Sequence, residues 1–201
     1  DGSGPVPRTV DETLVQADRL DTLRIRLAAA YKAIHALLLR HGCLDFINGQ
    51  SAHLASFYAD PMDIHHVFPK RWCEKKGIPP SVFNSIVNKT PISAASNRAI
   101  GGDAPSVYLK RIEEKHKLSS TQLDDILRTH LIDPVHLRND DFEAFYQARK
   151  AALAKLIEAA TGKPVLVSQP LTSAPVDIDI EDEDEGDEGV AVSSAALFTS
   201  T

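Results

Sequence analysis

Cysteine is scarce in this sequence, and long apolar runs are missing from it. The 201 residues include two cysteines, Cys43 and Cys73, and no CxxC pair, which argues against a disulfide framework and against a thiolate zinc site. We expect both cysteines to be buried thiols. The longest apolar run, around 34–39, is too short to cross a bilayer, and the N-terminus has no secretory pattern. A protein of the reducing cytoplasm, with no membrane association, fits these absences best.

A strong net charge is also lacking once the C-terminal end is set apart. The formal charge is -6, but nine of the 28 acidic residues lie between Asp177 and Glu188, so 22 basic and 19 acidic residues remain in the rest of the chain. Between His65 and Lys117 there are ten Lys or Arg and four Asp or Glu residues. A local positive excess is typical of proteins that bind a polyanion, although the count alone fits an ordinary solvated surface equally well.

Apolar periodicity predicts a mainly helical chain with two short strands. We expect an amphipathic helix over 11–40, closed by Gly42, and further helices over 72–76, 106–117, 120–130 and 139–161. The alternating residues that end at Pro69 indicate a strand running into a turn, and a second strand or loop is expected around 89–93, before a helix that begins near Ala94.

The composition divides the chain into three parts. We expect a flexible lead over 1–10, one folded domain over 11–164 with its central motif at 57–101, and a disordered tail over 165–201. The tail is rich in Pro, Ser and Thr and then acidic, with too little hydrophobicity to offset the entropy of ordering. Because the chain begins with Asp1 rather than Met, we also expect it to be a fragment of a longer protein.

The segment 65–97 contains the residue types needed to hydrolyse a phosphodiester bond. That reaction requires a group that deprotonates water, a cation that stabilises the developing charge, and residues that hold both in place. At a strand end, His65 and His66 can flank one cleft, so that His65 binds a metal while His66 faces the water. Asn97, near a helix start, offers an oxygen ligand to a hard cation, and Asn88 can fix the loop that carries His66.

These residues resemble a known nuclease pattern. The string His65-His66-Val67-Phe68-Pro69, followed by Asn88 and then by Asn97, is similar to the His-Asn-His (HNH) motif, a ββα-metal motif. The resemblance implies an α+β protein, a mainly helical domain wrapped around a small ββα-metal motif, with Mg²⁺ or Mn²⁺ as cofactor. By the same resemblance His66 is the general base, His65 and Asn97 are metal ligands, and Asn88 is the structural middle residue.

A wider similarity covers roughly 20–161. The segments 84–93, 97–101 and 105–109 look like the C-terminal nuclease domain of GmrSD-type restriction proteins. That family implies a defence nuclease that cuts foreign, often modified, double-stranded DNA and is normally fused to an N-terminal ParB-like domain, which is absent here. The 22-residue step from His66 to Asn88 is longer than in compact HNH proteins and indicates an insertion over 70–83.

Each assigned role has a plainer alternative. His66 could be a core or capping histidine, and Asp63 could reach the metal in place of His65. Asn97 could simply cap the following helix, and Asn88 could be only a turn residue.

The flanking cations and the overall function also leave alternatives open. Arg98 is the first candidate for a phosphate contact, followed by Lys89, Lys70 and Arg71, although each could be an ordinary surface charge. A DNA endonuclease is the function that we expect. The alternatives are a catalytically silent DNA-binding or partner-docking module of a larger defence protein, and a nuclease that cuts RNA.

Overall fold

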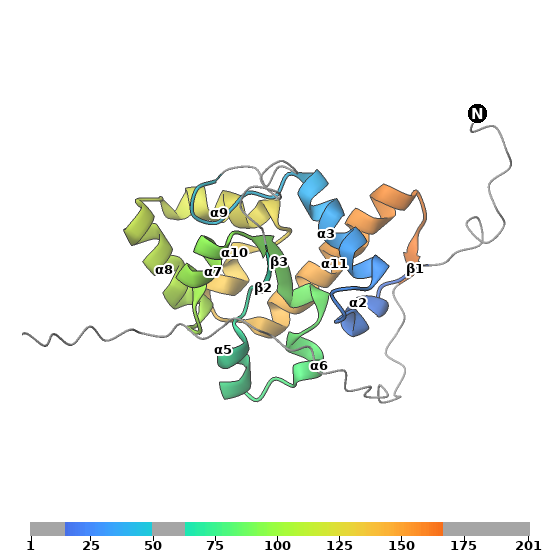
Figure 1. The fold of residues 1–201 in the computed structure, drawn as a ribbon, viewed down its shortest axis with the longest axis horizontal. Helices are drawn as coiled ribbons and strands as arrows, with labels where there is room; N and C mark the ends of the chain where they lie inside the picture. The colour runs from blue at the N-terminus through green and yellow to red at the C-terminus, as the bar shows by residue number, and fades with distance from the viewer. Residues whose placement is uncertain (1–14, 50–62, 167–201) are drawn as a thin grey trace, which may run out of the picture.

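The described part of the protein is mainly helical with a few short strands (Figure 1). The computed structural model describes residues 15–49 and 63–166. The expected lead over 1–10, the first part of the central motif (57–62) and the tail beyond 166 therefore lie outside the described residues. Around a central pair of strands stand helices α2 (Arg19–Thr22), α3 (Ala29–His41), α5 (Lys70–Lys75), α6 (Pro80–Phe83), α7 (Ala94–Ile100), α8 (Pro105–His116), α9 (Ser120–Thr129), α10 (Pro134–Arg138) and α11 (Phe142–Thr161).

The central pair consists of β2 (Asp63–His66) and β3 (Lys89–Ile92), which run antiparallel. His65 lies opposite Thr90 in this pair. Helix α7 follows β3 after one residue, Ser93, whose hydroxyl accepts a hydrogen bond from the backbone N–H of Ser96 and caps the helix. The two expected strands and the expected helix near Ala94 are thus confirmed, and Figure 1 shows them in the middle of the molecule.

Helix α11 packs against the residues that follow β2. It begins at the cap Asp141, which accepts a hydrogen bond from the N–H of Ala144, and it ends at Gly162 in the left-handed conformation, as a glycine cap allows. Its buried Phe142 and Phe145 meet the ring of Phe68, with ring centroids 5.3 and 4.9 Å away. Burying an aromatic ring of this kind contributes about 1.5–3 kcal/mol. The residues just after β2 are therefore anchored in the core.

Helices α8 and α9 agree with the expected helices over 106–117 and 120–130 to within one or two residues. The start of α9 is fixed by a capping box, in which Ser119 and Gln122 each bond the other's backbone N–H. Between α9 and α11 the short helix α10 was not expected from the sequence. Its five residues span little more than one turn, which is too short to show a helical period of apolar residues.

The expected helix over 11–40 is wrong over residues 15–28, and its first four residues lie outside the described part. The chain forms β1 (Val15–Gln16) and α2, then an irregular stretch, and only then α3, which ends at Gly42 as expected. Tertiary hydrogen bonds explain the break, because the carbonyl of Leu20 accepts from the Ser85 hydroxyl and that of Leu23 accepts from the Ile86 N–H, each at 2.9 Å. A continuous helix would have used both carbonyls internally.

The boundary of the expected tail also needs correction. Val165 and Leu166 form strand β4, which pairs in parallel with β1. The N–H of Ala17 continues this pairing by donating to the carbonyl of Leu166 at 2.9 Å. Residues 165 and 166 therefore belong to the folded part of the chain, because the backbone of β1 provides hydrogen-bond partners that composition does not reveal.

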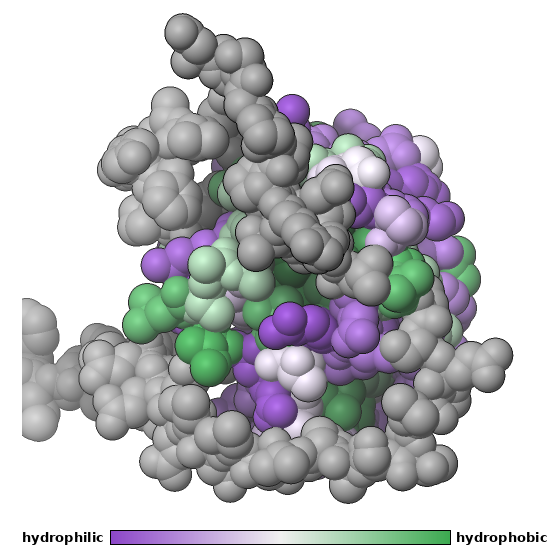
Figure 2. Space-filling view, turned by 90° about the vertical axis from the view of Figure 1, so that its right-hand side faces the viewer, coloured by the Kyte–Doolittle hydropathy of each residue, from purple (hydrophilic) through white to green (hydrophobic). Residues whose placement is uncertain are grey.

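The burial of the two cysteines agrees with the sequence analysis. Cys43 and Cys73 are free and buried, as expected. Within 15–49 and 63–166, no helix is both long and apolar enough to span a bilayer. Figure 2 shows, on one face, hydrophobic residues in separate groups between hydrophilic ones. The large apolar residues exposed in the described part are Ile25, Leu27, Val107, Val135 and Leu166.

Candidate active site

His66, the expected general base, is the last residue of β2 and is half-buried. Its Nε2 atom lies 2.9 Å from Oδ1 of Asn84, the residue that ends α6. Phe83, the preceding residue, meets the imidazole at a ring-centroid distance of 6.0 Å and an interplanar angle of 67°. His66 is therefore directed toward the end of α6. In the sequence, Asn84 is the first residue of the segment 84–93 that resembles the nuclease domain, but no role for its side chain is predicted there.

The backbone after His66 is held by buried groups. The N–H of Val67 donates to the carbonyl of Asn88 at 2.8 Å, and the Val67 carbonyl accepts from the hydroxyl of Tyr108 at 3.0 Å. Val67, Phe68 and Tyr108 are fully buried. The backbone that follows His66 is thus tied to buried groups of the core by two hydrogen bonds.

Asn88 is fully buried and joins the two segments that flank residues 70–83. Its Oδ1 accepts from the N–H of Phe68 at 2.9 Å, while its Nδ2 donates to the carbonyls of Phe68 at 2.9 Å and Phe83 at 3.0 Å. Phe68 lies two residues after His66, and Phe83 lies one residue before Asn84. The carboxamide of Asn88 therefore sets the spacing between the backbones that carry His66 and Asn84.

His65 and Asn97, the two expected metal ligands, come from β2 and α7. Because side chains alternate along a strand, His65 shares a face of the pair with Thr90, whereas His66 lies on the other face. Asn97 is half-buried, and its carboxamide makes no hydrogen bond within the described part of the chain. Asp63, the reserve ligand, lies in β2 opposite Ile92, and its side chain is outside the description. No three His, Cys, Asp or Glu side chains gather around one point among the described residues.

Asp45 fixes the start of α7 and was not expected from the sequence. Asp45 is 4 % exposed, and its carboxylate accepts from the N–H of Ser93 at 2.9 Å, from the hydroxyl of Ser96 at 2.8 Å and from the N–H of Ile47 at 3.2 Å. Burial alone would raise the pKa of Asp45, but these hydrogen bonds outweigh it and lower the pKa below its usual value. Since its oxygens are already engaged, Asp45 positions the helix that carries Asn97.

A buried guanidinium holds the start of β3. Arg149 of α11 is 1 % exposed and donates to the carbonyls of Val87 at 2.7 Å, Lys89 at 2.9 Å and His130 at 3.2 Å. Burial lowers its pKa to about 9. Because Val87 and Lys89 flank Asn88, Arg149 fixes the backbone on both sides of Asn88. No motif or spacing in the sequence indicates this role for Arg149.

His130, at the end of α9, also contacts β3. Its Nε2 donates to the carbonyl of Leu44 at 2.6 Å, so the neutral ring accepts at Nδ1 from the hydroxyl of Thr90 at 2.7 Å. Burial lowers the pKa of His130 to about 4. Thr90 lies opposite His65, and His130 therefore fixes the strand position that faces this candidate ligand.

Three of the four expected phosphate contacts are exposed, and one is buried. Lys70, Arg71 and Arg98 are exposed, and none of them forms an ion pair within the described residues. The aliphatic stem of Arg71 lies across Gly102, where a Cβ atom would come within 3.0 Å of its Cδ. Lys89 is buried, at 7 % exposure, because it lies in the central strand. Lys89 therefore does not present its charge as a surface contact would.

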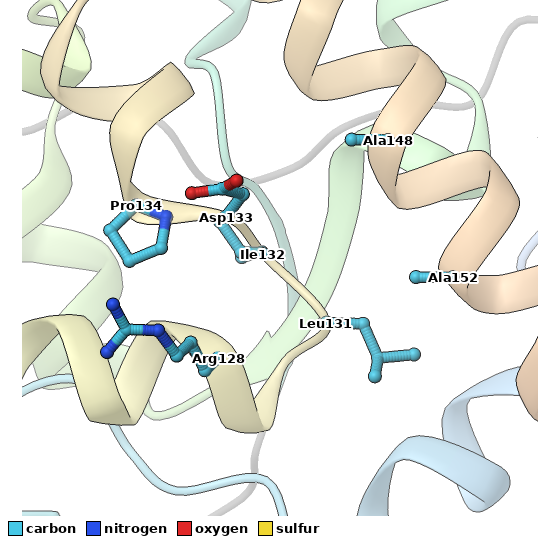
Figure 3. A pocket seen from close by; sticks show the side chains of 7 residues that line it. All are labelled: Arg128, Leu131, Ile132, Asp133, Pro134, Ala148 and Ala152. Atoms are coloured by element: carbon cyan, nitrogen blue, oxygen red, sulfur yellow. The ribbon is translucent and has the colours of Figure 1, made fainter.

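An open hollow of about 460 Å³ lies elsewhere, between α9, α10 and α11 (Figure 3). Figure 3 shows Arg128 on one side and Ala148 and Ala152 of α11 on the other. Arg128 is paired with Asp125, and Asp133 caps α10 through the N–H of Val135. The hollow shares no residue with the candidate site, and its charged side chains are already engaged.

Comparisons with known proteins identify no family for this chain. No family model matches the sequence, and no solved structure matches it. The chain is 26 % identical over 184 residues to an uncharacterised protein, MJ0686, of the archaeon Methanocaldococcus jannaschii. The match covers 79 % of this chain and 31 % of that relative, so the chain spans about a third of the relative's length.

Proposed function

We propose that this chain is the nuclease domain of a metal-dependent DNA endonuclease of the HNH type. The observation that supports this most is the order β2, β3, α7, in which His66 ends the first strand, a fully buried Asn88 ties the segments between the strands, and Asn97 follows on the helix. This order and these residue types match the ββα-metal pattern that the sequence resembles.

In this proposal His66 is the general base. Its imidazole takes a proton from the water that attacks the scissile phosphate. The hydrogen bonds of Tyr108 and Asn88 to the backbone after His66 keep this residue in position. The buried anchors Val67 and Phe68 would reduce the cost of ordering the site when DNA binds, because the loop is already fixed.

His65 and Asn97 would hold the divalent metal, with Asp63 as the alternative to His65. A carboxamide oxygen suits Mg²⁺ and Mn²⁺, and an imidazole nitrogen suits Mn²⁺ better than Mg²⁺. The carboxamide of Asn97, which has no hydrogen-bond partner among the described residues, fits such a role, and Asp45 keeps its helix in place. When bound, the metal would stabilise the negative charge that develops on the phosphate and on the leaving oxygen.

The proposed substrate is double-stranded DNA. Lys70, Arg71 and Arg98 are the proposed phosphate contacts, because they are exposed, carry no intramolecular ion pair among the described residues and flank the motif. Restriction of foreign or modified DNA, in a protein with an upstream ParB-like domain, is the biological setting that the resemblance to GmrSD-type proteins suggests.

Plasmid cleavage tests the proposal. We expect the purified chain to nick supercoiled plasmid with Mn²⁺ or Mg²⁺, and EDTA to abolish the activity. His66→Ala should lower the rate by at least about 100-fold, because a general base contributes this much. His41→Ala, at an exposed position at the end of α3, is the matched control and should cleave like the wild type.

Three results would reject the proposal. Full metal-dependent nicking by His66→Ala would remove the assigned base. DNA binding without cleavage would favour the silent binding module, and faster cleavage of a matched RNA would favour an RNA-cutting nuclease.

A further inference from the structure

We infer that Asn84 is a positioning residue that sets the tautomer of His66 and thereby assigns Nδ1 as the basic atom. The role of Nδ1 as the catalytic base rests on the proposed function, whereas the tautomer of His66 can be measured without it. The starting point is the 2.9 Å contact between His66 Nε2 and Asn84 Oδ1. A carboxamide oxygen only accepts, so Nε2 must carry the hydrogen. A neutral imidazole that is protonated at Nε2 has its lone pair at Nδ1.

The backbone of Asn84 is fixed on both sides. On one side, the carbonyl of Phe83 accepts from the carboxamide of Asn88, and the N–H of Asn84 donates to the carbonyl of Pro80 at 3.0 Å. On the other side, the fully buried Ser85 donates its hydroxyl to the carbonyl of Leu20. Asn84 is therefore placed before it meets the histidine, which is the condition for an orienting partner to be effective.

The same carboxamide that fixes Asn84 also fixes His66. Asn88 bonds both backbone groups of Phe68, two residues after His66, and the carbonyl of Phe83, next to Asn84. The insertion over 70–83 thus has a function in this fold, since its last helix, α6, delivers the acceptor for Nε2. Phe83 adds an edge contact to the imidazole and limits the rotation of its ring.

Two variants separate positioning from a general structural effect. Asn84→Ala removes the acceptor, whereas Asn84→Asp keeps an oxygen at the same distance from Nε2. Asn139→Ala is the matched control, because Asn139 also ends a short helix, α10, and its N–H also bonds a carbonyl of that helix, that of Val135. Thermal unfolding of all variants shows whether the fold is kept.

The experiment reads the tautomer and the activity of the full chain. Long-range ¹H–¹⁵N NMR of histidine-labelled protein, with the His66 signals identified by their loss in His66→Ala, should show hydrogen at Nε2 in the wild type and in Asn84→Asp. Asn84→Ala should show a mixture of both tautomers. In plasmid cleavage, Asn84→Ala should lower kcat by about 10- to 100-fold with little change in KM, and Asn84→Asp should restore most of it.

Two results would overturn the inference. One is hydrogen at Nδ1 of His66 in the wild type. The other is an unchanged Nε2 tautomer in a folded Asn84→Ala. If the wild type cleaves no nucleic acid, the proposed function fails, and the NMR spectra still decide whether Asn84 sets the tautomer.

Discussion

At the scale of single residues, the two buried histidines His35 and His130 differ in their hydrogen-bond partners. His130 uses both ring nitrogens, one toward Leu44 and one toward Thr90. His35 of α3 is 5 % exposed and meets Tyr31 edge-on at 4.8 Å, but neither of its ring nitrogens has a hydrogen-bond partner within the described residues. Burial, together with the charges of Arg149, Lys89 and Arg26, lowers the pKa of His35 to about 3.

We predict that the protein becomes less stable as the pH falls from about 6.5 to about 4. The folded-state pKa values of His35 and His130, about 3 and about 4, lie below the ordinary 6.5, so the unfolded chain binds more protons in this window. The free energy of unfolding should fall with decreasing pH, by at most about 1.4 kcal/mol per pH unit for each histidine. Urea unfolding at several pH values measures this slope, and a flat profile would show that the two rings are not buried and neutral.

Substituting each histidine separately should give opposite results at pH 7. His35→Leu removes a polar ring without a partner, and we expect stability to be unchanged or to rise by about 1 kcal/mol. His130→Leu leaves the Leu44 carbonyl and the Thr90 hydroxyl without their partner, and we expect a loss of about 1–3 kcal/mol. Denaturant midpoints compare the two variants, and equal losses would contradict the difference in partners.

At the scale of elements, the β2–β3 pair depends on the helices around it, because two short strands alone are marginal in water. Arg149 of α11 is one of these supports, with hydrogen bonds to carbonyls on both sides of Asn88. Its guanidinium has no carboxylate partner among the hydrogen bonds described, so backbone carbonyls provide its compensation.

Arg149→Leu should therefore destabilise the protein by about 3–5 kcal/mol, since it strips the partners from buried carbonyls. The matched control is Arg128→Leu, because the side chain of Arg128 is 58 % exposed and is paired with Asp125, an arrangement in which an ion pair contributes about 1 kcal/mol or less. Chemical denaturation of both variants tests the difference. A loss for Arg149→Leu no larger than that for Arg128→Leu would mean that the central pair does not need this cation.

Elements with strong local signals could be predicted from the sequence. Helices α8 and α9 have clear apolar stripes and start signals, and Gly42 ends α3 where a glycine cap was expected. The break before α3 could not be predicted, because it depends on hydrogen bonds between Leu20 or Leu23 and a segment some 60 residues later. Local periodicity cannot report such contacts.

The candidate site shows the same division. His65 and His66 lie in β2, Asn88 directly precedes β3 and Asn97 lies in α7, as the motif predicts. The chemical roles of these residues remain predictions. The groups that hold them come from distant positions, namely Asp45 after α3 and Arg149 on α11. A sequence motif reports residue types at fixed spacing, and it contains no information about partners brought in by the fold.

At the scale of the whole molecule, the proposed site is assembled from three separate stretches of chain. The segment 63–97 provides the proposed chemical groups, residues around 45 fix the start of α7, and residues 130–149 fix β3. Figure 1 shows how the helices of these stretches surround the central strands. The account therefore requires that side chains of β2 and α7 converge on one cation, while the rest of the molecule keeps these two elements in register.

Binding of Mn²⁺ to the purified chain tests this convergence most directly. Titration followed by electron paramagnetic resonance should show one Mn²⁺ bound per chain, with the affinity lowered at least about tenfold by His65→Ala and by Asn97→Ala. Asn139→Ala should bind like the wild type, since Asn139 lies at the exposed end of α10. Wild-type affinity in both His65→Ala and Asn97→Ala would contradict a shared metal site.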